Sequence, residues 1–113
     1  MKQFKLKADQ IERLIDPIGA ATATDMIVVE GKDIGYMYRD NPINDIDTGW
    51  RFFAGNESDE YIKNNDNTGF YDINTIANYD PSIIPCLNEP IGTAWERIPD
   101  TNRYRRVNQY NEE

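Results

Sequence analysis

The feature that most constrains the fold is the run Gly49-Trp-Arg-Phe-Phe-Ala-Gly55, which predicts a β-strand over Trp50–Ala54. Aromatic residues favour strands, and the two glycines bound the run. Because side chains alternate along a strand, Phe53 falls on the face opposite Trp50 and Phe52. Apolar side chains therefore occur on both faces, and aromatic area left in water favours association. We expect a helix to cover one face, and a loop or a partner to cover the other.

Hydrophobic spacing before this strand predicts an α+β fold with a mainly antiparallel sheet. Residues 8–18 carry four apolar residues at helical spacing and predict an N-terminal amphipathic helix packed on the sheet. Residues 19–24 are small and indicate a connector. Met26–Glu30 and Ile34–Arg39 are β-rich runs separated by a short turn, and together they predict a hairpin.

The second half of the chain predicts one or two further short helices and several short strands. In chain order, we expect a short helix at Ser58–Lys63, a turn at 64–69, a strand that begins at Phe70 and Tyr71, a helix from Ile73 capped by Asp72, a buried crossing around Ile83, Ile84 and Leu87, a strand at Gly92–Arg97, and an edge strand at Tyr104 and Val107.

The chain of 113 residues suits one compact domain. We expect residues 1–22 to form an N-terminal arm and helix packed on the domain, and residues 23–98 to form the domain body. Residues 99–113 would be a C-terminal extension that is mobile after Asn108.

Composition excludes many enzyme classes. The chain contains no histidine, which removes imidazole bases, catalytic triads and histidine-built metal sites. Its one cysteine, Cys86, cannot close an intramolecular disulfide and lies in an apolar context without nearby cations, so we expect it to pack rather than to react. No apolar run approaches the length of a membrane span, and the N-terminus lacks the apolar stretch of a secretory signal. A cytoplasmic location is the expectation.

Charge is unevenly distributed along the chain. The whole sequence has 12 basic and 20 acidic residues, a net charge of −8. Residues 25–100 hold 15 acidic and 5 basic residues, which gives 5 − 15 = −10, so the two ends together carry +2. Phosphate backbones would repel an acidic body, so we expect no nucleic-acid binding. A basic protein partner is favoured instead, although solubility alone also explains an acidic surface.

Five acidic residues that flank the aromatic run, two before it and three after it, are the candidate partner-binding residues. Contact with a partner and a plain solvated surface both account for them, and paired carboxylates also suit the acid and base of a glycosidase. They are Asp45, Asp47, Glu57, Asp59 and Glu60.

We expect no cofactor and no metal. The segment from Asn64 to Asp72 loosely resembles a calcium loop, but Thr75 stands where the bidentate glutamate is needed, so a turn is the better interpretation. Phosphate-binding glycine loops are missing from the sequence. Arg39 and Arg51 lie among acids and aromatics, where they suit internal ion pairs and ring stacking, or direct recognition of a partner.

Four motifs carry a resemblance to a known family. They are Ile34-Gly-Tyr-Met-Tyr-Arg39, Gly49-Trp-Arg-Phe-Phe-Ala-Gly55, Tyr71-Asp-Ile-Asn-Thr-Ile-Ala-Asn-Tyr-Asp-Pro-Ser-Ile-Ile-Pro85 and Ile91-Gly-Thr-Ala-Trp-Glu-Arg97. From about Ala23 to Arg97, roughly two thirds of the chain, the sequence resembles bacterial immunity-protein domains of polymorphic toxin systems, first catalogued as a domain of unknown function.

The resemblance implies a protein that neutralises a cognate toxin by binding it, without catalysis. A non-toxin interaction or scaffold module is the alternative, and a small carboxylate-based hydrolase is a third class. Within the motifs, we expect seven residues to be structural, namely Arg39, Trp50, Arg51, Phe52, Tyr71, Asp80 and Trp95.

Overall fold

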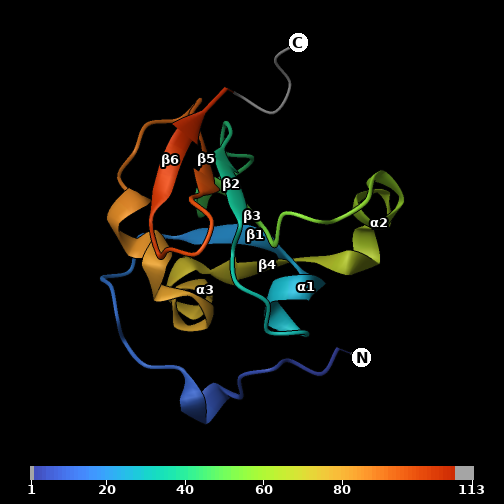
Figure 1. Ribbon diagram of the computed structural model, residues 1–113. Helices are drawn as coiled ribbons and strands as arrows, with labels where there is room; N and C mark the ends of the chain where they lie inside the picture. Colours follow the sequence, from blue (N-terminus) through green and yellow to red (C-terminus); the bar gives the residue numbers. More distant parts are fainter. Residues whose placement is uncertain (1, 109–113) are drawn as a thin grey trace.

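A six-stranded sheet organises the chain in the computed structural model, which describes residues 2–108 (Figure 1). Its strands lie in the order β4-β1-β3-β2-β5-β6. The β1–β3 pair is parallel and the other four pairs are antiparallel, which confirms the expected α+β class with a mainly antiparallel sheet. The strands are β1 (Ala20–Thr24), β2 (Tyr36–Arg39), β3 (Asp47–Phe53), β4 (Thr68–Asp72), β5 (Ala94–Arg97) and β6 (Tyr104–Val107).

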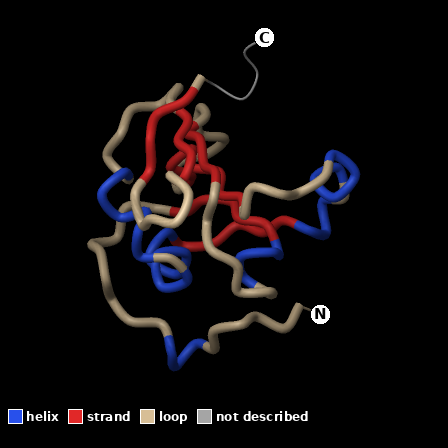
Figure 2. Tube along the Cα trace, viewed as in Figure 1, coloured by secondary structure: helices blue, strands red, loops and turns tan. Residues whose placement is uncertain are grey.

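Short helices connect these strands (Figure 2). The α-helices are α1 (Asp25–Val28), α2 (Asp59–Lys63) and α3 (Ile73–Tyr79), and the 3-10 helices are η1 (Ala8–Gln10), η2 (Asn65–Asn67) and η3 (Pro81–Cys86). Two begin as the sequence predicts. Ser58 caps α2 by accepting a hydrogen bond from Tyr61 N, and Asp72 caps α3 by accepting one from Asn74 N.

The core lies between one face of the sheet and the helices α1 and α3. Met37 of β2 pairs with Phe52 of β3, and both side chains are buried together with Trp50. Ile73 and Ile76 of α3 complete the cluster from the other side. Each fully buried side chain of this size contributes about 2–3 kcal/mol, so the run around Trp50 is the centre of the core as the sequence suggests.

The expected hairpin of Met26–Glu30 with Ile34–Arg39 is wrong. Residues 20–24, which we expected to be a connector, form the interior strand β1 between β4 and β3, where alanine side chains leave room for α1 and α3. Residues 25–28 form α1, and the chain turns after this helix at Gly31, which has φ +78° and whose amide donates to Ile27 O. β2 pairs with β3 and β5 instead.

The expected N-terminal helix over residues 8–18 is also wrong, because only η1 is helical there. Ile11 and Ile15 are half-buried whereas Leu14 and Ile18 are exposed. Residues four apart, such as Ile11 and Ile15, lie on one side of a helix and also on one side of an extended chain, so this spacing does not distinguish the two structures. Side chains of α3 hold the segment instead, since Asn74 Oδ1 accepts from the amides of Leu14 and Ile15 at 2.8 and 3.2 Å.

The C-terminal edge strand is confirmed, because β6 pairs with β5 from Ala94↔Val107 to Arg97↔Tyr104. The mobility that we expected after Asn108 concerns residues 109–113, which lie outside the described residues. Within residues 2–108, the helices are all too short to cross a lipid bilayer.

Candidate partner-binding surface

Three aromatic side chains form a platform on the sheet face opposite the core. Tyr36 and Tyr38 alternate with the buried Met37 along β2, and Phe53 lies across from Tyr36 on β3. The rings of Tyr38 and Phe53 are stacked with centroids 5.7 Å apart, and Tyr36 lies 6.0 Å from Phe53. All three residues are only half-buried. The sheet therefore presents aromatic surface on its second face, as the sequence of the Trp50 run predicts.

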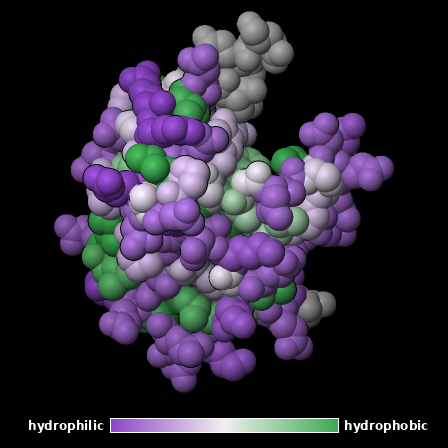
Figure 3. Space-filling model, viewed as in Figure 1, coloured by the Kyte–Doolittle hydropathy of each residue, from purple (hydrophilic) through white to green (hydrophobic). Residues whose placement is uncertain are grey.

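This platform is the floor of an open groove of about 370 Å³, and α2 contributes one wall. α2 projects away from the sheet, at the end of the segment that follows β3 (Figure 1). In the space-filling view of the same orientation, the projecting lobe on the right is largely hydrophilic (Figure 3). Ile62 adds an exposed apolar side chain to the wall. The groove thus combines an aromatic floor with polar margins.

Carboxylates form the acidic margin of the groove. Glu57 lines it and accepts hydrogen bonds from Thr24 Oγ1 at 2.6 Å, Ala54 N at 2.7 Å and Gly55 N at 2.9 Å. These bonds fix the chain between β3 and α2. Asp59 also lines the groove and is exposed in the first turn of α2. The groove therefore has a negative margin held in a defined position.

Asp47 is buried and internally bound. Its side chain has no exposed area, and both of its oxygens accept hydrogen bonds of 2.9 Å from the Arg51 guanidinium. The amides of Gly49 and Ile43 donate to the same carboxylate. The Arg51 hydrogen bonds, followed by those amides, lower the pKa of Asp47 to about 2 in spite of its burial. Asp47 organises the β2–β3 connection rather than facing a partner.

The structure brings only part of the predicted acidic set together. Glu57 and Asp59 share the groove, and Glu60 is exposed next to Asp59 on α2. Asp45 is exposed in the connection before β3, whereas Glu57 follows the other end of that strand. Seven strand residues span about 20 Å, so Asp45 and the groove acids lie at opposite ends of the open face.

Sequence reasoning missed the lining of the groove. The available signal was the alternation of Tyr36 and Tyr38 with Met37, which places both tyrosine rings on one face of the strand. Sequence reasoning also gave no role to Ile62 of α2. The groove depends on how the chain after β3 carries α2 beside the sheet, and no local pattern encodes that placement.

Arg39 and Trp50 tie the opposite, buried face to the loop after η3. The Arg39 guanidinium donates to the carbonyls of Thr48 at 2.9 Å and Glu89 at 2.8 Å, and it lies 5.7 Å from the Trp50 ring centroid. Trp50 Nε1 donates to Leu87 O at 3.2 Å. Arg39 pairs in register with Trp50 and not with Arg51, so the two arginines lie on neighbouring strands with separate partners.

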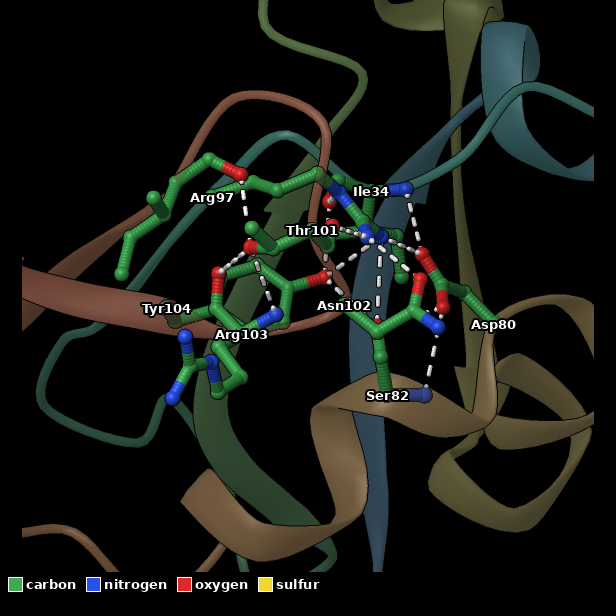
Figure 4. A network of polar contacts seen from close by, with 9 residues as sticks. Ile34, Asp80, Ser82, Arg97, Thr101, Asn102, Arg103 and Tyr104 are labelled. Carbon is green, nitrogen blue, oxygen red and sulfur yellow. Dashed lines mark hydrogen bonds and ion pairs between the residues drawn. The ribbon is translucent and has the colours of Figure 1, made fainter.

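Asp80 is the centre of a polar network that joins η3 to β5 and β6 (Figure 4). Its carboxylate accepts hydrogen bonds from Ile34 N at 2.9 Å and Ser82 Oγ at 2.6 Å, and it forms an ion pair with Arg97. Tyr104 Oη donates to Ile34 O at 2.7 Å and accepts from Arg97 at 3.0 Å. Burial raises the pKa of Tyr104 to about 12. The network holds the edge of the sheet in place.

The other two motif aromatics also pack internally. Tyr71 on β4 makes an edge-to-face contact with Phe4, with centroids 5.7 Å apart. Trp95 on β5 packs against the core, and its Nε1 donates to Thr93 Oγ1 at 3.0 Å. Burial raises the pKa of Cys86, so its thiol is kept neutral.

In the part of the chain that the structure describes, no group of three or more potential metal-ligating side chains comes together. Neither the comparison with curated proteins nor that with solved structures returned a match. The scan of protein families matches residues 21–108 to the immunity protein Imm33 domain. The matched segment contains all six strands except the first residue of β1, together with the aromatic platform and the groove. This chain therefore belongs to the Imm33 immunity-protein family.

Proposed function

We propose that this protein neutralises a cognate toxin of a bacterial polymorphic toxin system by binding it stoichiometrically through the acidic, aromatic-floored groove. The observation that carries the proposal is the meeting of Tyr36, Tyr38 and Phe53 with the acids Glu57 and Asp59 in one open groove. Aromatic side chains supply large contact areas with few rotatable bonds, and they are frequent anchors of protein interfaces.

The partner that best fits this surface is basic. The chain carries a net charge of −8, and Asp59 and Glu60 project from α2 beside the groove. Complementary charge accelerates encounter, and a lysine or arginine placed over the aromatic floor would gain both ring stacking and ion pairing. We place the encounter in the cytoplasm, which suits the free thiol of Cys86.

Binding suits this geometry better than hydrolysis. A carboxylate-based hydrolase needs two acids that face each other across an enclosed substrate. Here Glu57 receives three hydrogen bonds from the scaffold, Asp59 lies on a projecting helix, and the groove between them is open. The arrangement supports occupation of a protein surface without chemistry.

The test uses the toxin encoded beside this gene, with its catalytic residue inactivated. Neutralising the exposed pair in Asp59→Asn/Glu60→Gln is expected to weaken binding by about tenfold, mostly through slower association. The matched control is Asp9→Asn/Asp16→Asn, which removes the same charge from exposed positions of the N-terminal arm. Equal losses in both variants would indicate a general charge effect and would contradict the groove as the contact site. A wild-type protein that fails to bind the toxin would favour a non-toxin interaction module.

A further inference from the structure

The connection between β2 and β3 exposes the two most exposed large hydrophobic side chains of residues 2–108. Ile43 is 74% exposed and Ile46 is 62% exposed. Asp45, also exposed, lies between them in the sequence. We call Asn41–Ile46 the isoleucine loop. Single exposed apolar residues are common, whereas apolar patches rimmed by polar residues mark interaction sites, and this loop combines two exposed isoleucines with an acid.

Hydrogen bonds fix the shape of the isoleucine loop. Asn44 Oδ1 accepts from Ile46 N at 3.1 Å and from Asp47 N at 2.9 Å. Ile43 N donates to Asp47 Oδ2 at 2.9 Å. Ile46 O accepts from Ala20 N at 2.7 Å, which joins the loop to the start of β1. A partner therefore meets a loop that is already ordered, so binding loses less conformational entropy.

The sheet supports the loop from beneath. Asp47 is held by Arg51 on β3, and Asp40 N donates to Gly49 O at 2.8 Å to close the base of the loop. Gly49 has φ +92°, and a Cβ there would lie 2.1 Å from Asp40 O, so only glycine fits this crossing. The buried pair of Asp47 and Arg51 thus serves to present the exposed residues next to it.

We propose that the isoleucine loop is a second anchor for the toxin, with Ile43 and Ile46 entering an apolar pocket whose rim carries a lysine or arginine that faces Asp45. This inference rests on the proposed function and assigns it a further contact. A second copy of this chain is a poorer occupant, because a symmetric contact would bring Asp45 of one copy toward the same acidic loop of the other. Charge complementarity therefore favours a cationic partner.

The test compares two double variants by calorimetric titration with the inactivated toxin encoded beside the gene. Ile43→Ser/Ile46→Ser removes both anchors, and Phe4→Ser/Leu14→Ser removes two large apolar side chains that are 43% and 42% exposed in the N-terminal arm. The first variant is expected to bind at least about 30-fold more weakly, and the control within about threefold of wild type. Urea unfolding of both variants verifies that the exposed substitutions leave the fold intact.

The outcomes separate the inference from the function on which it rests. Tight wild-type binding with unchanged affinity of Ile43→Ser/Ile46→Ser overturns the anchor and leaves toxin binding by the groove in place. If the wild-type protein does not bind the toxin, both the loop anchor and the proposed function are contradicted. Sedimentation gives a third arm: a wild-type dimer that the loop variant converts to a monomer would identify the loop as a self-association surface and would also overturn the proposal.

Discussion

The guanidinium of Arg51 donates two hydrogen bonds of 2.9 Å to the carboxylate of Asp47, four residues earlier on the same strand. Residues four apart on a strand point to the same face, so a local pair can form within β3. Both side chains are largely buried. The pair links the open face of the sheet to the loop that carries Ile43 and Ile46.

Replacing Asp47 with asparagine is expected to destabilise the protein by about 2 kcal/mol at neutral pH, because the native pKa of about 2 lies below the ordinary aspartate value of 3.8. A lowered native pKa means that the contribution is complete above about pH 5 and is lost progressively as pH falls through about 2. Urea unfolding of wild type and Asp47→Asn between neutral and acidic pH measures the difference. The exposed Asp45→Asn is the control and should change stability by less than about 0.5 kcal/mol. If the difference in unfolding free energy between wild type and Asp47→Asn stays constant down to acidic pH, the lowered pKa of Asp47 is contradicted.

Removing the hydroxyl of Tyr104 is expected to cost about 1–3 kcal/mol, because Ile34 O and Arg97 lose a buried partner. The native pKa of about 12 lies above the ordinary value of 10.0. The neutral phenol is therefore favoured in the folded state, and this contribution is present below about pH 10 and is lost as pH rises toward 12. Ultraviolet titration of tyrosinate should show a component at about pH 12 that Tyr104→Phe lacks. Identical titration curves would rule out this environment for Tyr104.

Asn74→Ala is expected to release the N-terminal arm while the sheet stays folded. The side chain receives the amides of Leu14 and Ile15 and donates to Glu12 O at 2.8 Å. Loss of these bonds should raise the rate of tryptic cleavage after Arg13 by about tenfold, since cleavage requires local opening. The exposed Asn88→Ala is the matched control. Unchanged cleavage in Asn74→Ala would show that apolar contacts alone hold the arm.

Strands with a strong local pattern could be predicted from the sequence. The Trp50 run, the short helix at Ser58–Lys63, the Asp72 helix cap and the edge strand at Tyr104 carry their signals within a few residues. The strand β1 could not be predicted this way. Its three alanines have weak strand preference, and the segment is stable as a strand because β3 and β4 pair with it on both sides.

The negative charge of the candidate site was predictable from the sequence, but the spatial arrangement of its residues was not. Local charge identified Asp59 and Glu60 as exposed acids, whereas Asp47 had the same appearance in sequence and is buried because Arg51 lies on the same strand face. The groove also needs β2 to lie beside β3, so that Tyr38 stacks on Phe53. Such a contact between separate strands follows from the sheet order, which no single segment specifies.

Side-chain footprinting by hydroxyl radicals tests the central claim most directly, namely that the open face of the sheet is what the toxin occupies. The inactivated toxin is added to the wild-type protein, and labelling of each reactive side chain is compared with and without it. Phe4 and Leu14, exposed apolar residues of the N-terminal arm, act as internal controls. The account predicts protection of Tyr36, Tyr38 and Ile62 with no change at these controls. Protection confined to the control residues, with the groove still labelled in the complex, would contradict it.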